Sequence, residues 1–133
     1  MAAHCANAEN VAQYLSRHRK VSAVTYPTLF TCVDLARLRD NMSGTGGPLL
    51  QFELADGLAA GRRFVEALQL IYHVSNIGDA RTLATHPAST TYASVSPEAR
   101  RAAGVNDGTI RLSVGIEHIE YILADLEQAP THA

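Results

Sequence analysis

The sequence is poor in cysteine, lysine and long apolar runs, and each scarcity excludes a class of protein. No run in the 133 residues approaches the length of about 18 apolar residues that a membrane-spanning helix requires. Residues 1–10 also lack the apolar core of a secretory signal. The two cysteines, Cys5 and Cys32, form no metal-ligand spacing and are too few for a disulfide framework. We therefore expect a cytosolic protein with reduced thiols and no membrane partner.

The sequence also lacks a large excess of positive or negative charge. The net charge is −2, from 11 basic and 13 acidic residues, whereas nucleic-acid binding needs a clustered basic surface. The doublets Arg62-Arg63 and Arg100-Arg101 are typical of solvated helix faces. The six histidines show neither His-x-His nor His-x-x-x-His spacing, so we expect no metal site. Lys20 is the only lysine, and chemistry that needs a lysine amine has this one candidate.

Hydrophobic periodicity predicts one α+β domain that covers residues 1–133. Helices are expected at 7–18, 34–39, 58–70, 97–103 and 117–126, and strands at 21–26, 50–54, 72–77 and 109–116. Asn7 is the expected cap of the first helix, and Ser96-Pro97-Glu98 is a strong helix start. Thr82 to Ser94 fits neither period and is predicted to be an ordered irregular loop. The expected architecture is a small, mostly antiparallel sheet of about four strands with helices on one face.

One arginine stands out from the strand pattern alone. Ile110, Leu112 and Val114 alternate with polar residues, so Arg111 points to the face opposite the core, beside Ser113. One interpretation is a surface arginine on an exposed sheet face. The other is an anion clamp, because a guanidinium matches a carboxylate with two parallel hydrogen bonds. Periodicity leaves both interpretations open.

Three motifs, in this order and spacing, resemble a known family. They are Ser75-Asn76-Ile77-Gly78-Asp79-Ala80, His86-Pro87-Ala88-Ser89-Thr90-Thr91, and Ile110-Arg111-Leu112-Ser113-Val114-Gly115-Ile116-Glu117. Together they resemble the C-terminal motifs of the pyridoxal-phosphate enzymes of cysteine and methionine metabolism, and the resemblance covers nearly the whole chain. Asn76 and the His-Pro-Ala-Ser-Thr-Thr motif are most similar to O-acetylhomoserine sulfhydrylase, since lyase-type members more often have serine at that position.

The resemblance implies a fold and a set of site residues. The fold is that of the C-terminal small domain of aspartate-aminotransferase-like enzymes. Arg111 matches the arginine that holds the substrate α-carboxylate, Asn76 a position that orients that carboxylate, and Thr91 a hydroxyl residue of the same pocket. Tyr92 departs from the pattern, because the family usually has histidine there.

The family's lysine, which forms a Schiff base with the cofactor, has no match in this sequence. Lys20 lies in Arg19-Lys20-Val21 and not in a Ser-x-Thr-Lys context. We therefore expect no catalytic residue and no cofactor in this segment, and pyridoxal phosphate in a parent enzyme whose large domain lies upstream of Met1. The expected partners are that large domain, an amino-acid substrate and further copies of the same chain. A free-standing module that binds an amino acid or a protein remains the alternative.

Overall fold

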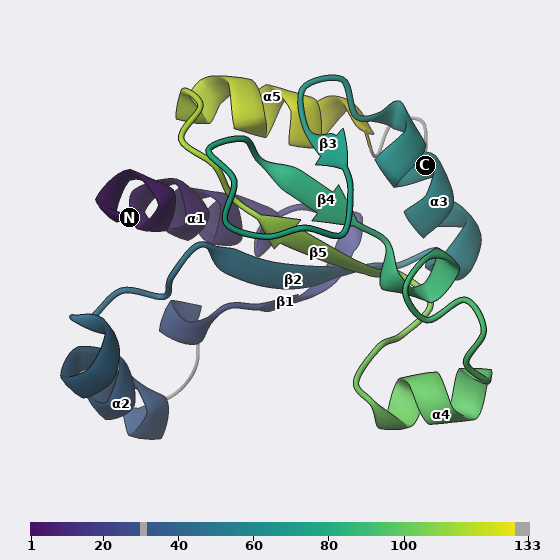
Figure 1. Cartoon of the computed structure of the whole chain (residues 1–133), viewed down its shortest axis with the longest axis horizontal. Helices are drawn as coiled ribbons and strands as arrows, with labels where there is room; N and C mark the ends of the chain where they lie inside the picture. The colour runs from purple at the N-terminus through teal and green to yellow at the C-terminus, as the bar shows by residue number, and fades with distance from the viewer. Residues whose placement is uncertain (30–31, 130–133) are drawn as a thin grey trace.

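A five-stranded mixed sheet forms the centre of the protein (Figure 1). The structure is a computed structural model that describes residues 1–29 and 32–129. The strands are β1 Val21–Thr25, β2 Leu49–Leu54, β3 Tyr72–His73, β4 Leu83–Thr85 and β5 Thr109–Ser113. They are arranged in the order β1-β2-β5-β4-β3. The pairs β1–β2, β2–β5 and β4–β5 are antiparallel, and the pair β3–β4 is parallel.

Three helices cover one face of this sheet (Figure 1). The helices are α1 Ala2–Leu15, α2 Cys32–Met42, α3 Gly57–Ala67, α4 Pro97–Ala102 and α5 Ile119–Gln128. Helices α1, α3 and α5 pack on the sheet and share one core with it, whereas α2 and α4 stand away from that layer (Figure 1). In the described part of the chain, no helix is long and apolar enough to cross a membrane.

The core lies between the three helices and alternate residues of the central strands. Phe52 and Ile110 are buried on this face, and the Phe52 ring meets the Phe64 ring of α3 edge-on at 5.5 Å between centroids. Val11 of α1 and Ile122 of α5 complete the same cluster. Burial of such side chains is the main favourable term in folding. The face that carries the apolar residues of the strands is therefore the face that the helices cover.

The α+β class and the helices on one face are confirmed, but the strand count and the sheet type differ from the expectation. The additional strand is β4, which lies inside the segment predicted to be an irregular loop. All three of its residues, Leu83, Ala84 and Thr85, are buried, so the strand shows no polar–apolar alternation. Its parallel pairing with β3 makes the sheet mixed, although the other three pairings are antiparallel as expected.

Of the two predicted helix caps, Ser96 is confirmed and Asn7 is not. The Ser96 side chain accepts a hydrogen bond from the Ala99 N–H at 3.3 Å, which confirms the cap of α4. The prediction for Asn7 was wrong, because α1 begins five residues earlier, at Ala2. Asn7 instead donates from its side chain to the carbonyls of Gly115 and Glu117, at 3.1 and 2.9 Å, and so connects α1 to the segment between β5 and α5.

Candidate functional site

The site is built on the sheet face that the three helices leave open. Arg111 of β5 lies opposite Gln51 of β2 on one side and opposite Thr85 of β4 on the other. Residues directly opposite each other in an antiparallel pair share a face, with Cβ atoms about 5 Å apart. The structure therefore places Arg111 away from the core, between two polar neighbours, as its position in the alternation predicts.

A loop crosses this face and holds the arginine. We call residues 74–80, between β3 and β4, the strap (Figure 1). Nη2 of Arg111 donates to the Ser75 carbonyl at 2.5 Å, to the Thr85 hydroxyl at 3.3 Å and to the Asn76 carbonyl at 3.4 Å. The Thr85 hydroxyl itself donates to the Val74 carbonyl at 2.7 Å. One nitrogen of the guanidinium thus fixes the side chain against the strap.

The rest of the guanidinium remains available. A guanidinium has five N–H donors, and in the described residues Nε and Nη1 of Arg111 donate to no side chain or carbonyl. No carboxylate among them pairs with Arg111 either, whereas Arg81 pairs with Asp79 and Arg100 pairs with Asp107. A half-buried arginine without a counter-ion attracts an anion such as a carboxylate, and the unused N–H groups can donate to it.

The two other predicted residues lie on the strap side of Arg111. Asn76 contacts Arg111 through its main-chain carbonyl, and its side chain is exposed. Thr91 lines a hollow of about 430 Å³. We call this the hydroxyl hollow, and its lining residues are His73, Val74, Ser75, Thr85, Thr90 and Thr91. Ser75 and Thr85 line the hollow and also bind Arg111, so the three predicted residues belong to one region.

A buried histidine fixes the loop that carries Thr91. The His86 ring is fully buried, with Nε2 2.8 Å from the Asp107 carbonyl and Nδ1 2.7 Å from the Ser89 hydroxyl. A carbonyl only accepts, so Nε2 carries the proton and Nδ1 accepts from Ser89. Burial lowers the pKa of His86, which keeps the ring neutral. His86 shapes this loop and connects it to the segment before β5.

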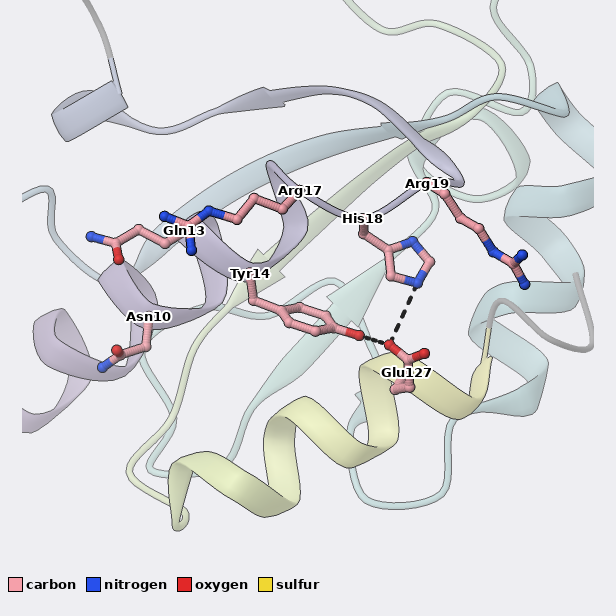
Figure 2. Close-up of a pocket in the computed structure, with 7 residues that line it drawn as sticks. All are labelled: Asn10, Gln13, Tyr14, Arg17, His18, Arg19 and Glu127. Atoms are coloured by element: carbon pink, nitrogen blue, oxygen red, sulfur yellow. Dashed lines mark hydrogen bonds and ion pairs between the residues drawn. The ribbon is translucent and has the colours of Figure 1, made fainter.

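A larger hollow, of about 560 Å³, lies between the ends of α1 and α5 (Figure 2). Its lining residues are Asn10, Gln13, Tyr14, Arg17, His18, Arg19 and Glu127. The Tyr14 hydroxyl donates to the Glu127 carboxylate, and Nε2 of His18 lies 3.6 Å from it. Arg17 and Arg19 point in different directions (Figure 2). Tyr14, His18 and Glu127 therefore bind one another, and Asn10 and Gln13 bond within α1 to Ala6 and Glu9. The polar groups do not converge on a ligand, so size alone does not make this hollow the site.

Comparison with known proteins decides the family. Residues 1–130 match the family described as "Cys/Met metabolism PLP-dependent enzyme". The chain belongs to this family. It is 46% identical to an L-methionine γ-lyase of Pseudomonas putida and 42% identical to an O-acetyl-L-homoserine sulfhydrylase of Thermus thermophilus, in each case over 95% of this chain. It spans 31% and 30% of the length of these two relatives. The sequence identities to the lyase and to the sulfhydrylase differ by only a few per cent.

Solved structures of the family show the same fold. A putative O-acetylhomoserine (thiol)-lyase of Campylobacter jejuni, with N'-pyridoxyl-lysine-5'-monophosphate, matches with a TM-score of 0.86 and 36% identity over 98% of this chain and 31% of its own. A cystathionine γ-lyase of Lactobacillus plantarum, complexed with L-serine, matches with a TM-score of 0.87 and 33% identity over 99% of this chain and 34% of its own. The expected fold type is confirmed, and the chain corresponds to about a third of each enzyme.

The residues around Arg111 do not fit pyridoxal phosphate by themselves. The cofactor of this family needs a lysine amine, and Lys20 precedes β1 at the end where β1 pairs with Leu54. Thr25, at the other end of β1, is the residue that pairs with Gln51. Five residues of extended chain place Lys20 about 17 Å along the strand from Thr25. No chemical step is therefore assigned to the cofactor in this chain.

Sequence reasoning missed three groups that the structure brings to the site. They are the Thr85 hydroxyl, the Ser75 carbonyl and the Gln51 side chain. Thr85 belongs to the strand that shows no alternation, and a main-chain acceptor leaves no signal in a sequence. Gln51 does fall on the polar side of its strand, and only the register of β2 against β5 connects it with Arg111.

Proposed function

We propose that this chain is the C-terminal, substrate-carboxylate-binding domain of a pyridoxal-phosphate-dependent enzyme of sulfur amino acid metabolism, of the O-acetylhomoserine sulfhydrylase type. The proposal depends on one observation: Arg111 is half-buried, fixed through Nη2, and has no carboxylate partner in residues 1–29 and 32–129. Asn76 supports the sulfhydrylase assignment through the resemblance of its motif. The family's larger, cofactor-binding domain would supply the chemistry, and this chain alone would be inactive.

In this proposal each residue has a simple task. Arg111 binds the α-carboxylate of the substrate through the charge of its guanidinium and through an N–H of Nε or of Nη1, neither of which has a partner among the described residues. Asn76 helps to orient the carboxylate, and its main-chain carbonyl holds Nη2 of the guanidinium at 3.4 Å. The Thr91 hydroxyl, from the hydroxyl hollow, contributes a further polar group at the edge of the same region. The chain thereby positions one end of an amino acid and leaves its reacting end to the other domain.

The alternative is a free-standing module that binds an amino acid. It is favoured by the fact that Ser75, Asn76 and Thr85 of this same chain hold the arginine in place. A complete module should bind more tightly than an isolated domain of an enzyme, whose site is finished by other residues. A Kd for L-methionine below about 1 mM would favour the module, and a weaker Kd would favour the domain.

Titration with L-methionine, followed by calorimetry or by amide NMR shifts, tests both proposals, the enzyme domain and the free-standing module. Arg111→Ala should abolish binding, and Arg111→Lys should weaken it strongly because an ammonium lacks the planar pair of donors. Arg101→Ala is the matched control, since it removes an exposed arginine of α4. If Arg111→Ala binds methionine as the unaltered chain does, Arg111 does not hold the carboxylate and the proposed function is wrong.

Self-association is a separate proposal. Ile77, Ile116 and Tyr121 are exposed at 59, 53 and 68% of their surface, and apolar side chains of this size are typical of surfaces that contact other protein when they form a patch. We expect the chain to form homo-oligomers, as measured by sedimentation velocity over a range of concentrations. A constant monomer mass would contradict this.

A further inference from the structure

Gln51 is the neighbour of Arg111 on the side away from the strap. The two residues lie directly opposite each other in the β2–β5 pair, on the sheet face that α1, α3 and α5 leave open. All hydrogen bonds of Arg111 run towards the strap and β4. No hydrogen bond of Arg111 to a described residue runs towards Gln51.

The carboxamide of Gln51 is itself unused. It is half-buried and forms no hydrogen bond with any described residue. Glu53, the next polar residue on the same face of β2, differs in this respect. Glu53 accepts from the Thr109 hydroxyl at 2.6 Å and from the Asn106 side chain at 3.3 Å. Glu53 thus has a structural role that explains its presence in the sheet, and Gln51 has none.

A hollow of about 340 Å³ opens beside these two residues. We call it the β2 hollow, and its lining residues are Thr25, Pro27, Leu49, Leu50, Gln51 and Arg111. Small-molecule sites are mostly apolar with a few convergent polar groups, and this hollow combines proline and leucine walls with one cation and one amide.

We propose that Gln51 is a further substrate-binding residue: its amide N–H donates a hydrogen bond to the carboxylate that Arg111 holds, at the edge of the β2 hollow. The inference rests on the proposed function of Arg111 and adds a residue that selects for a carboxylate ligand. A neutral amide beside the guanidinium adds a donor without neutralising it, and so favours a carboxylate ligand. An acidic residue at this position would form an ion pair with Arg111 and exclude the ligand.

The test compares two changes at Gln51 with the same two changes at Gln69. Gln51→Leu keeps the volume but removes the donor, and Gln51→Glu introduces a carboxylate that competes for Arg111. Gln69, an exposed residue between α3 and β3, carries the matched controls Gln69→Leu and Gln69→Glu. Each variant of the 133-residue chain is titrated by amide NMR with L-methionine, and with 3-(methylthio)propylamine, which lacks the carboxylate.

Gln51→Leu should weaken methionine binding by about ten-fold or more, as expected for one hydrogen bond to a charged group, and Gln51→Glu should weaken it further. The Gln69 variants should bind methionine within about two-fold of the unaltered chain. The changes at Gln51 should not weaken the binding of the amine, because the amine lacks the carboxylate. If the Gln51 and Gln69 variants bind alike while Arg111→Ala abolishes binding, the inference is wrong and the proposed function stands. If Arg111→Ala has no effect, or the unaltered chain shows no shift at about 50 mM methionine, both fail.

Discussion

The two faces of the sheet are made by the same strands but differ in what determines their residues. On the covered face, Phe52 and Ile110 are buried against α3, α1 and α5, and packing alone accounts for them. On the open face, Gln51 and Arg111 come from the adjacent positions of the same two strands, on the side that α1, α3 and α5 do not cover. A change on the first face should therefore affect folding, and a change on the second should affect binding.

The first prediction compares neighbours in the sequence that lie on opposite faces. Phe52→Ala should lower the free energy of unfolding by about 4 kcal/mol, because it removes a buried ring and leaves a cavity. Gln51→Ala should change it by less than about 0.5 kcal/mol, the usual range for a partly exposed position without bonded partners. Urea denaturation of both variants measures the difference. Similar losses would show that the open face also has a large structural role.

The second prediction concerns the contact between α3 and His86. A Cβ added at Gly61 would lie 2.3 Å from Nε2 of His86, the atom that donates to the Asp107 carbonyl. Gly61→Ala should lower the free energy of unfolding by about 2 kcal/mol, although alanine itself favours a helix by about 1 kcal/mol. The midpoint of urea denaturation measures this loss.

The control for that prediction is a double-mutant cycle. In the background of His86→Ala the ring is gone, so Gly61→Ala should become neutral or stabilising. If Gly61→Ala costs the same free energy in both backgrounds, the helix does not depend on its contact with the imidazole.

The covered face could be predicted from the sequence, and the open face only in part. The alternation of Leu50, Phe52 and Leu54 indicates a strand and its buried side, because burial demands a period of two. The same alternation turns Arg111 outward. It does not give the register, which brings Gln51 and Thr85 to either side of the arginine, because register depends on contacts between segments that are distant in the chain.

Two further errors have physical causes of the same kind. β4 was predicted as part of a loop because it is only three residues long and buried throughout, so it shows no periodicity. Asn7 was predicted as a cap because asparagine favours helix starts. Its actual partners, the carbonyls of Gly115 and Glu117, lie more than 100 residues away in the sequence. Propensity describes local competition, and these contacts are not local.

The third prediction is a pH dependence of stability. Burial lowers the pKa of His86 in the folded chain below its usual value of 6.5, so the unfolded chain binds a proton more readily. The stabilising effect is complete above pH 6.5 and is lost as the pH falls towards the folded pKa. The free energy of unfolding should fall by up to about 1.4 kcal/mol per pH unit, the value for one proton.

Urea denaturation at several pH values between about 7 and 5, around the unfolded pKa, measures that slope. His86→Gln should be less stable than the unaltered chain at neutral pH but show a flatter slope. His18→Gln is the companion variant, because burial lowers the pKa of His18 in the same direction. An unchanged slope in His86→Gln would mean that this imidazole does not contribute to the pH dependence.

The fourth prediction concerns a small change in stability that distinguishes the two interpretations of Arg111, a surface arginine and an anion clamp. Arg111→Met keeps a long side chain but removes the bonds to Ser75, Asn76 and Thr85. We expect a loss of only about 0.5 kcal/mol in global stability, together with faster hydrogen exchange in the strap, at the Gly78 amide that donates to the Ser113 hydroxyl. A loss as large as that of Phe52→Ala would mean that the arginine is retained for folding. A small loss, combined with lost methionine binding, would mean that it is retained for its ligand.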